Sequence, residues 1–314
     1  MAPHSSARCS GRRDLNLGVP LHVEVPIEDR WIATRRGTLF ARSWKPARAR
    51  ATATFLLFHD SLGCVELWRD FPEQLASATG LPVVAYDRLG FGQSDANEGP
   101  LAVTFTRDEA NDVVPLLREA LGLEMIIPFG HSVGGSMAVA TAARWPEQCA
   151  GVITEAAQAF VESRTLEGIA AEHARFEQPG ELRRLERYHG DKARWVLDSW
   201  YHTWFSPGFA DWSIDADLRQ VRCPTLAIHG DRDEYGSTAH PERIARLVQG
   251  QSTTVILAGC GHVPHREETA RVLAEIDGFV AQIAASAPYE QERLSVSVTL
   301  PPGASTAVMS PPNA

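Results

Sequence analysis

The fold of this chain is decided by the stretch Gly130-His131-Ser132-Val133-Gly134. An apolar run at residues 125–129 precedes it and small residues follow at 136–140, so it predicts a sharp turn from a buried strand into a helix. The two glycines let the backbone pack closely at that turn, and the serine Oγ projects to where a base and a substrate can reach it. Ser132 is therefore a candidate nucleophile.

The composition of the 314 residues indicates a folded, acidic protein. With 44% hydrophobic residues, the chain can bury one large core or two modest ones. The net charge of -9 argues against a surface for nucleic acid or anionic membranes, which needs clustered Lys and Arg. No apolar run approaches the roughly 18 residues of a membrane span. A cytoplasmic protein with a small-molecule substrate is expected, and its assembly is left open, with a homodimer as one alternative.

The five cysteines are scattered and show no C-x-x-C spacing. This distribution predicts neither a disulfide framework nor a zinc site. The sequence is therefore expected to need no cofactor and no metal.

Short apolar runs alternate with amphipathic segments, a pattern typical of a parallel sheet covered by helices on both faces. The predicted strands are residues 22–32, 38–44, 54–58, 82–86, 125–129, 151–154, 225–228 and 253–257. The predicted helices between and after them are 66–78, 107–121, 133–144, 242–248 and 267–284. The fold class is thus α/β, with an eight-stranded, mostly parallel sheet whose first two strands form an antiparallel hairpin around Arg36-Gly37.

The alternation stops between residues 156 and 221, where only helix-like segments occur, at 159–176, 179–188 and 191–205. This segment is predicted to be a helical cap over the carboxyl edge of the sheet, inserted between two parts of the core, 21–155 and 222–286. Residues 1–20 and 287–314 lack periodicity and are predicted to be disordered tails.

The predicted cap is rich in large aromatic side chains, which either pack it against the core or line a substrate pocket. Both interpretations remain open because one does not exclude the other. The candidate substrate-binding residues are His59, Trp200, Trp204 and Val263.

Ligands in open parallel sheets bind beyond the carboxyl ends of the strands, so the reactive groups are sought there. His262 follows the last predicted strand in a glycine-containing loop, and it is the candidate base that takes the serine proton. Its rival, His265, lies three residues further on, at the expected start of the last helix.

A carboxylate is needed to hold the imidazole in the right tautomer and to stabilise its protonated form. Asp233 is preferred for this role because it lies beyond the end of a predicted strand, whereas Asp231 is better placed to cap the turn. Glu155, at the end of the neighbouring strand, is the alternative acid.

Acyl transfer places negative charge on the former carbonyl oxygen, and backbone N–H groups aimed at it lower the barrier. The expected donors of this oxyanion hole are the N–H groups of Val133 and Ser61. Asp60 stands beside them, and we expect its carboxylate to point away or to bond the loop backbone. Pro128, near the end of a central strand, is expected to mark the end of pairing.

Five segments follow one another in the order known from one protein family. They are Phe58-His59-Asp60, Tyr86-Asp87-Arg88-Leu89-Gly90-Phe91-Gly92-Gln93-Ser94, residues 130–135, residues 229–233 and Gly261-His262. Over residues 22–285 the chain resembles capped single-domain α/β-hydrolases, a group that includes esterases, cofactor-free haloperoxidases and carbon-carbon bond hydrolases. It departs from the family pattern at Asp60, where glycine is usual.

The resemblance and the three reactive residues together predict a serine hydrolase that cleaves an ester-like bond of a small apolar or aromatic substrate through an acyl-enzyme on Ser132. A carbon-carbon hydrolase or a perhydrolase on the same triad is the alternative within the family. A small-molecule receptor that retains the triad is the alternative from another class.

Overall fold

The computed structural model describes residues 25–47 and 53–297, with side chains up to residue 285. The predicted tail at residues 1–20 lies outside the described residues, as do positions 298–314.

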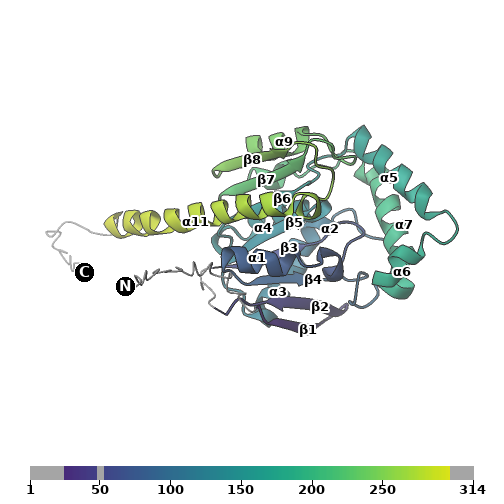
Figure 1. Cartoon of the computed structure of the whole chain (residues 1–314), viewed down its shortest axis with the longest axis horizontal. Coiled ribbons are helices and arrows are strands. Elements are labelled where there is room, and N and C mark those ends of the chain that lie inside the picture. The colour runs from purple at the N-terminus through teal and green to yellow at the C-terminus, as the bar shows by residue number, and fades with distance from the viewer. Residues whose placement is uncertain (1–24, 48–52, 298–314) are drawn as a thin grey trace, which may run out of the picture.

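The core is an eight-stranded sheet with the strand order β1-β2-β4-β3-β5-β6-β7-β8 (Figure 1). The strands are β1 (Ile27–Thr34), β2 (Gly37–Trp44), β3 (Thr54–Phe58), β4 (Val83–Tyr86), β5 (Ile126–His131), β6 (Val152–Glu155), β7 (Thr225–Gly230) and β8 (Ser252–Leu257). β2 pairs antiparallel with both β1 and β4, and the remaining neighbours pair parallel. The predicted α/β class with a mostly parallel eight-stranded sheet is confirmed.

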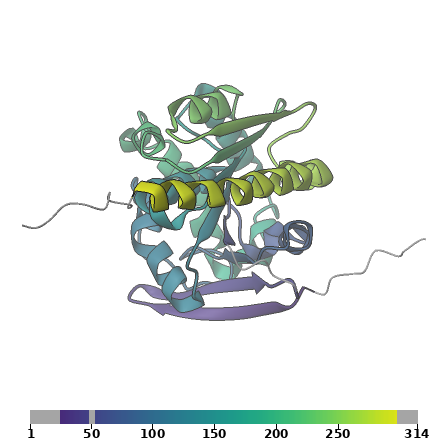
Figure 2. The ribbon, with the colours of Figure 1, turned by 90° about the vertical axis from the view of Figure 1, so that its left-hand side faces the viewer.

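Helices cover both faces of this sheet. One apolar cluster joins α1 (Phe71–Thr79) and α11 (Thr269–Ser297) to the sheet. The other joins α3 (Val114–Leu121), α4 (Val133–Arg144) and α9 (Ala239–Leu247) to the opposite face. Figure 2 shows the β1–β2 hairpin along one edge of the molecule, away from α9. The two apolar cores hold the strand ends in fixed positions, and the chemistry-bearing residues follow those ends.

Two predicted helices are each interrupted. The segment predicted as 66–78 is a short 3₁₀ helix, η1 (Val65–Trp68), followed by α1, because Arg69 takes a positive φ of 55° that no helix accommodates. The segment predicted as 107–121 divides into α2 (Phe105–Asp108), a π-helical turn (Glu109–Val113) and α3. Pro115 lacks an N–H and crowds the preceding turn, which widens the helix there.

Pro128 does not end strand pairing, contrary to expectation. It lies opposite Leu56 of β3, and the pairing of β5 continues through Gly130. Pairing with β6 begins only at Phe129. The hairpin turn is at Arg35 and Arg36, one residue earlier than predicted.

The end of the chain also differs from the prediction. A short helix, α10 (Pro264–Glu267), precedes α11, and α11 runs to Ser297, past the predicted boundary at residue 286. The apolar residues Val272, Ile276 and Phe279 bury one side of α11 against the sheet, which gives this helix a firm base.

Four helices lie between β6 and β7 and are here termed the inserted helices. They are α5 (Ser163–Phe176), α6 (Arg183–His189), α7 (Ala193–Trp204) and α8 (Asp215–Leu218). Figure 1 shows α5, α6 and α7 grouped at one end of the sheet.

Polar contacts fix the inserted helices to the body. His189 of α6 accepts a hydrogen bond from Gly92 N–H at Nδ1 (2.9 Å) and places Nε2 3.0 Å from the carbonyl of Leu62. Lys192 Nζ donates to the carbonyl oxygens of Gly92 and Ser94, at 2.8 and 2.5 Å. These contacts connect α6 and the start of α7 to two turns at the end of the sheet.

Candidate active site

Ser132 lies on the sharp turn between β5 and α4, with φ 56° and ψ -129°. Glycine is required on both sides of it. A Cβ at Gly130 would lie 1.9 Å from Gly134 O, and a Cβ at Gly134 would lie 2.1 Å from Phe58 O. Because those contacts are impossible, the sequence pattern around Ser132 is a direct consequence of the close approach of α4 to the sheet.

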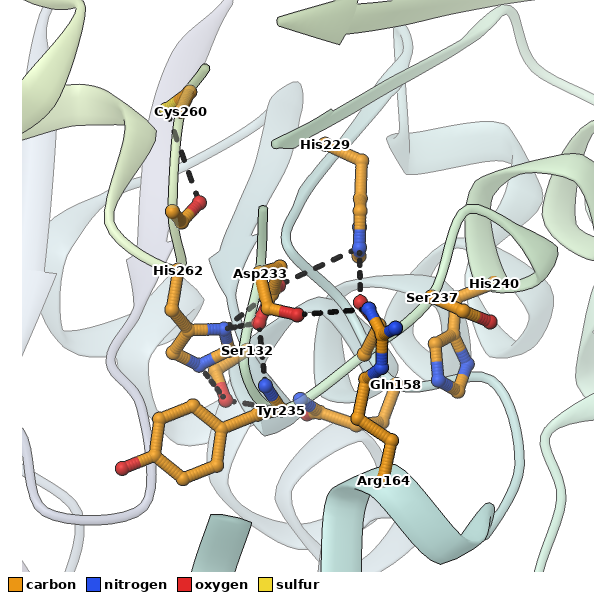
Figure 3. A network of polar contacts seen from close by, with 12 residues as sticks. Ser132, Gln158, Arg164, His229, Asp233, Tyr235, Ser237, His240, Cys260 and His262 are labelled. Atoms are coloured by element: carbon orange, nitrogen blue, oxygen red, sulfur yellow. Dashed lines mark hydrogen bonds and ion pairs between the residues drawn. The ribbon is translucent and has the colours of Figure 1, made fainter. Parts of the chain in front are cut away.

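Three side chains from distant parts of the chain meet at this turn (Figure 3). His262 Nε2 lies 3.1 Å from Ser132 Oγ, and His262 Nδ1 lies 2.8 Å from both carboxylate oxygens of Asp233. Asp233 is 1% exposed, whereas Ser132 and His262 are 6% and 9% exposed and line a cavity. The acid is thus shielded from water, and the other two groups are open to a ligand.

The hydrogen bonds assign the protons. Asp233 can only accept from Nδ1 when it is ionised, so Nδ1 of His262 carries a hydrogen and Nε2 is free to accept the Ser132 proton. Burial acts to raise the pKa of Asp233, but its hydrogen bond to His262 and the charge there outweigh burial, and the pKa lies below its usual value. This arrangement can remove a proton from Ser132 and stabilise the imidazolium that results.

Further groups hold Asp233 in place. Its Oδ1 accepts from Tyr235 N–H at 2.7 Å, and its carbonyl accepts from Arg164 at 3.2 Å. His229 Nε2 lies 3.4 Å from Oδ2, on the side away from His262. The Tyr235 ring packs against the His262 imidazole with 4.6 Å between centroids. The acid and the base therefore have a fixed relative orientation.

The rival residues have other partners. Asp231 accepts a hydrogen bond from Gly259 N–H at 2.6 Å, as expected of a turn-capping aspartate. Glu155 does not reach His262; its Oε2 lies 2.6 Å from Nδ1 of His265. Both members of this second pair are buried.

Within the described residues, one group of side chains has the spacing of a metal site: His131, Glu155 and His265, with ligand atoms within 4.8 Å of one another. The donor atoms are engaged in hydrogen bonds, His265 Nδ1 with Glu155 and His131 Nε2 with the carbonyl of His262 at 2.7 Å. The geometry is that of a hydrogen-bonded cluster.

The expected oxyanion donors lie beside the serine. Val133 is the first residue of α4, so its N–H has no intrahelical acceptor. Ser61 lies in the turn after β3 and lines the same cavity as Ser132. No hydrogen bond to the Ser61 N–H is found in the described part of the chain, which leaves this donor free.

Asp60 points away from those donors. Its Oδ1 accepts from Leu62 N–H at 2.8 Å, and its Oδ2 lies 3.3 Å from His131 Nδ1. Both His131 nitrogens face acceptors, which favours the protonated form of its ring beside Asp60. Burial acts to lower the pKa of His131, but the hydrogen bond and charge of Asp60 raise it above the usual value.

A cavity of about 390 Å³ opens beside Ser132. Trp200, Trp204 and Val263, expected as substrate-binding residues, line it. Trp204 also packs on Phe209 at 5.2 Å, so the same ring is pocket wall and packing contact. His59 lines the cavity as well, but its ring nitrogens are engaged by the carbonyl of Asp60 and by Arg88 N–H, which makes it a support of the turn.

Gln158 was missed by sequence reasoning. It follows β6, is 2% exposed, and its side-chain amide lies 3.1 Å from Ser132 Oγ. Ala156, at the end of β6, has a positive φ of 48° that redirects the chain toward the serine. A glutamine and a strained alanine carry no motif, so the sequence holds no signal that identifies them.

Comparisons with known proteins find similarity to hydrolases. The sequence profile of the family described as the alpha/beta hydrolase fold matches residues 53–187. The chain is 27% identical over 202 residues to the serine hydrolase BPHL of Mus musculus, a match that covers 58% of this chain and 64% of that protein, less than two thirds of its length. It is 27% identical to 2-hydroxymuconate semialdehyde hydrolase of Pseudomonas sp. strain CF600, over 70% of this chain and 83% of that one.

Among solved structures, 2-hydroxy-6-oxo-6-phenylhexa-2,4-dienoate hydrolase from Rhodococcus sp. strain RHA1 superposes with a TM-score of 0.67. The superposition covers 81% of this chain and 99% of that one at 17% identity, which shows a shared fold. In the described part of the chain no helix has both the length and the apolar character that spanning a membrane requires.

Proposed function

We propose that this chain, whose fold is that of the α/β-hydrolases, is a serine hydrolase that cleaves an ester-like bond through an acyl-enzyme on Ser132. The observation that carries the proposal is the bridge of His262, 3.1 Å from Ser132 Oγ on one side and 2.8 Å from Asp233 on the other.

In the first half of the reaction, His262 Nε2 takes the Ser132 proton while Oγ attacks the substrate carbonyl carbon. The carbonyl oxygen becomes an anion, and the N–H groups of Val133 and Ser61 donate to it, each worth roughly 10² to 10³ in rate. The carbon-oxygen bond to the leaving group then breaks, and the leaving group takes its proton from His262.

In the second half, His262 removes a proton from water, and the hydroxide attacks the acyl carbon. The bond to Ser132 Oγ breaks, and His262 returns the proton to it. Asp233 remains ionised throughout and stabilises the imidazolium in both halves. The side-chain amide of Gln158, in the loop after β6, is hydrogen-bonded to Ser132 Oγ and helps to hold it in position.

The inserted helices serve as a cap that determines the shape of the substrate. Apolar and aromatic side chains form much of the cavity wall, so a small apolar or aromatic portion of the substrate would bury there. These wall residues are Leu62, Leu67, Ile169, Phe176, Leu185, Trp200 and Trp204.

A carbon-carbon bond hydrolase is the second candidate. It is supported by the similarity to two hydrolases named for substrates that carry a ketone or an aldehyde and no ester, one matched in sequence and one in fold. The same serine, histidine and aspartate would act on a ketone carbonyl in place of an ester.

The test uses p-nitrophenyl esters of increasing acyl length. We expect steady release of p-nitrophenolate by the wild type and loss of it in Ser132→Ala, with Ser206→Ala, whose hydroxyl bonds the carbonyl of Thr203, as the matched control. A single burst without turnover would contradict the proposal in favour of a receptor. Turnover of a 2-hydroxy-6-oxo-dienoate with none of the esters would favour the second candidate.

A further inference from the structure

Three arginines in the wall of the active-site cavity, Arg69, Arg187 and Arg266, have no carboxylate partner among the described side chains. Two of them come from segments that touch each other. Arg69 follows η1 and Arg266 lies in α10, and both line the cavity beside Ser132. No ion pair of either is found among the side chains that the structure describes. By contrast, Arg184 of the same wall lies 3.2 Å from Glu181. Arg69 and Arg266 are both exposed, so a ligand in the cavity can reach their charges.

The segments that carry the two arginines touch each other beside the cavity. Arg266 Nη2 donates a hydrogen bond to the carbonyl of Leu67, in η1. Arg69 comes two residues after Leu67 in the sequence. The short helix therefore brings the positive charges of two distant segments to the same wall.

Their positive charge is not neutralised. Burial lowers the pKa of Arg266, and the charge of Arg69 lowers it further, while Asp60 acts in the opposite sense. Asp60 is already paired with His131. An anion near both arginines would offset this repulsion.

The backbone at Arg69 is strained in the same way as at the nucleophile. Arg69 has φ 55° and ψ -127°, and Ser132 has φ 56° and ψ -129°. Strain of this kind in a residue other than glycine persists only where the surrounding structure holds it, and such residues are enriched at functional sites. Trp68, next to Arg69, also lines the cavity, and its buried indole N–H has no acceptor in the described part of the chain.

The remaining acids of the wall gather elsewhere. Glu172 and Glu234 lie near Tyr235: burial raises the pKa of this phenol, and their charges raise it further. Glu172 is also within 3.6 Å of Arg175. The side of the cavity at η1 and α10 is therefore the one that attracts an anion.

We propose that Arg69 and Arg266 form a carboxylate-binding subsite, so that the compound hydrolysed at Ser132 carries a free carboxylate at a distance from the scissile bond. This inference rests on the proposed serine hydrolase function and names its substrate class. A planar guanidinium matches a carboxylate with two parallel hydrogen bonds, which are stronger than neutral ones.

The experiment compares mono-p-nitrophenyl adipate with its methyl ester, which has the same chain without the charge. We expect the wild type to favour the charged ester, and Arg69→Gln/Arg266→Gln to lower kcat/KM for it by about 10- to 100-fold, the effect of losing hydrogen bonds to a charged group. The methyl ester should change less than about twofold. Arg184→Gln removes a charge from the same wall that Glu181 already neutralises, so it should retain the preference.

A binding measurement separates this inference from the proposed function. Monomethyl adipate should bind Ser132→Ala more tightly than dimethyl adipate by calorimetry, and the double arginine variant should lose the difference. Equal binding of the two, or equal losses on both esters, would overturn the subsite even if the ester chemistry stands. If no ester is hydrolysed but monomethyl adipate binds selectively, the subsite stands and the proposed chemistry falls. Arg69→Lys/Arg266→Lys, which keeps the charges, provides the comparison if the glutamine variant does not fold.

Discussion

Two histidine-carboxylate pairs take their acids from the ends of the neighbouring strands β6 and β7, and they differ in what the second imidazole nitrogen meets. In the serine-facing pair, Asp233 with His262, Nε2 meets the hydroxyl of Ser132. In the inner pair, Glu155 with His265, the ring packs between Trp68 and Phe71, at 4.8 and 5.2 Å. The same two chemical groups therefore make a base in one place and a packed polar contact in the other. The group that faces the second imidazole nitrogen therefore decides whether the histidine can act as a base.

His131 lies between the two pairs, with its ring 5.1 Å from both His262 and His265. Its bond to the carbonyl of His262 fixes the backbone of the base, and its bond to Asp60 reaches the turn that carries Ser61. The second position of the Gly-x-Ser-x-Gly stretch thus connects three active-site segments.

The largest expected effect distinguishes which carboxylate, that of Asp233 or that of Glu155, supports His262 in the reaction. Asp233→Asn should lower kcat by about 10⁴-fold, because an amide favours the wrong tautomer of His262. Glu155→Gln should lower kcat less than tenfold, since Glu155 has no contact with His262. Ester hydrolysis measured on both variants decides the point, and a larger loss in Glu155→Gln would reverse the assignment.

The inner pair is expected to matter for stability. His265→Leu leaves the buried Glu155 carboxylate unpaired and should lower the free energy of unfolding by about 3–5 kcal/mol. Glu155→Leu/His265→Leu removes both polar groups and should recover most of that loss. Urea unfolding of the wild type, His265→Leu and the double variant measures this. A double variant as unstable as His265→Leu would contradict it.

The inner pair also predicts a pH dependence of stability. Burial lowers the pKa of His265, so below about pH 6.5 the unfolded chain binds more protons than the folded one, and the free energy of unfolding falls as the pH falls. The pKa of Glu155 is also lowered, because the charge and hydrogen bond of His265 outweigh burial. The contribution of Glu155 to the free energy of unfolding is lost at still lower pH.

Unfolding measured from pH 7.5 to 4.5 should show this decline, and Glu155→Leu/His265→Leu should show a shallower one. Other buried histidines with lowered pKa values contribute to the slope and keep it from vanishing: His59, His189, His229 and His240. Equal slopes in both proteins would mean that the inner pair does not titrate as described.

The smallest effect is expected at the link between the pairs. Asp60→Asn keeps an acceptor for Leu62 N–H but removes the charge opposite His131, so the pKa of His131 should fall. We expect kcat to change by less than tenfold. An NMR titration of His131 measures the shift, and an unchanged pKa would show that Asp60 does not hold the proton there.

The sequence predicted those parts of the site that depend on glycine geometry and strand ends. The turn at Ser132 is visible because Gly130 and Gly134 are sterically required. The order of the acid and the base follows from the order of β7 and β8. The contacts of Gln158, Arg69 and His131 could not be predicted, because they depend on side-chain packing between distant segments and on positive φ angles at residues other than glycine.

The helix interruption at Arg69 shows the same limit. Residues 65–79 have a helical composition, and nothing in it indicates that one arginine adopts a strained backbone. Because the sequence predicts a continuous helix here, it does not indicate that Arg69 leaves the helix and lines the cavity.

His189 of α6 has a further consequence. It accepts from Gly92 and donates to the carbonyl of Leu62, the neighbour of the free Ser61 N–H. One imidazole thus joins the turn that holds Gly92 to the turn that carries Ser61. A substitution at His189 would therefore loosen both turns and their contact with α6 at once.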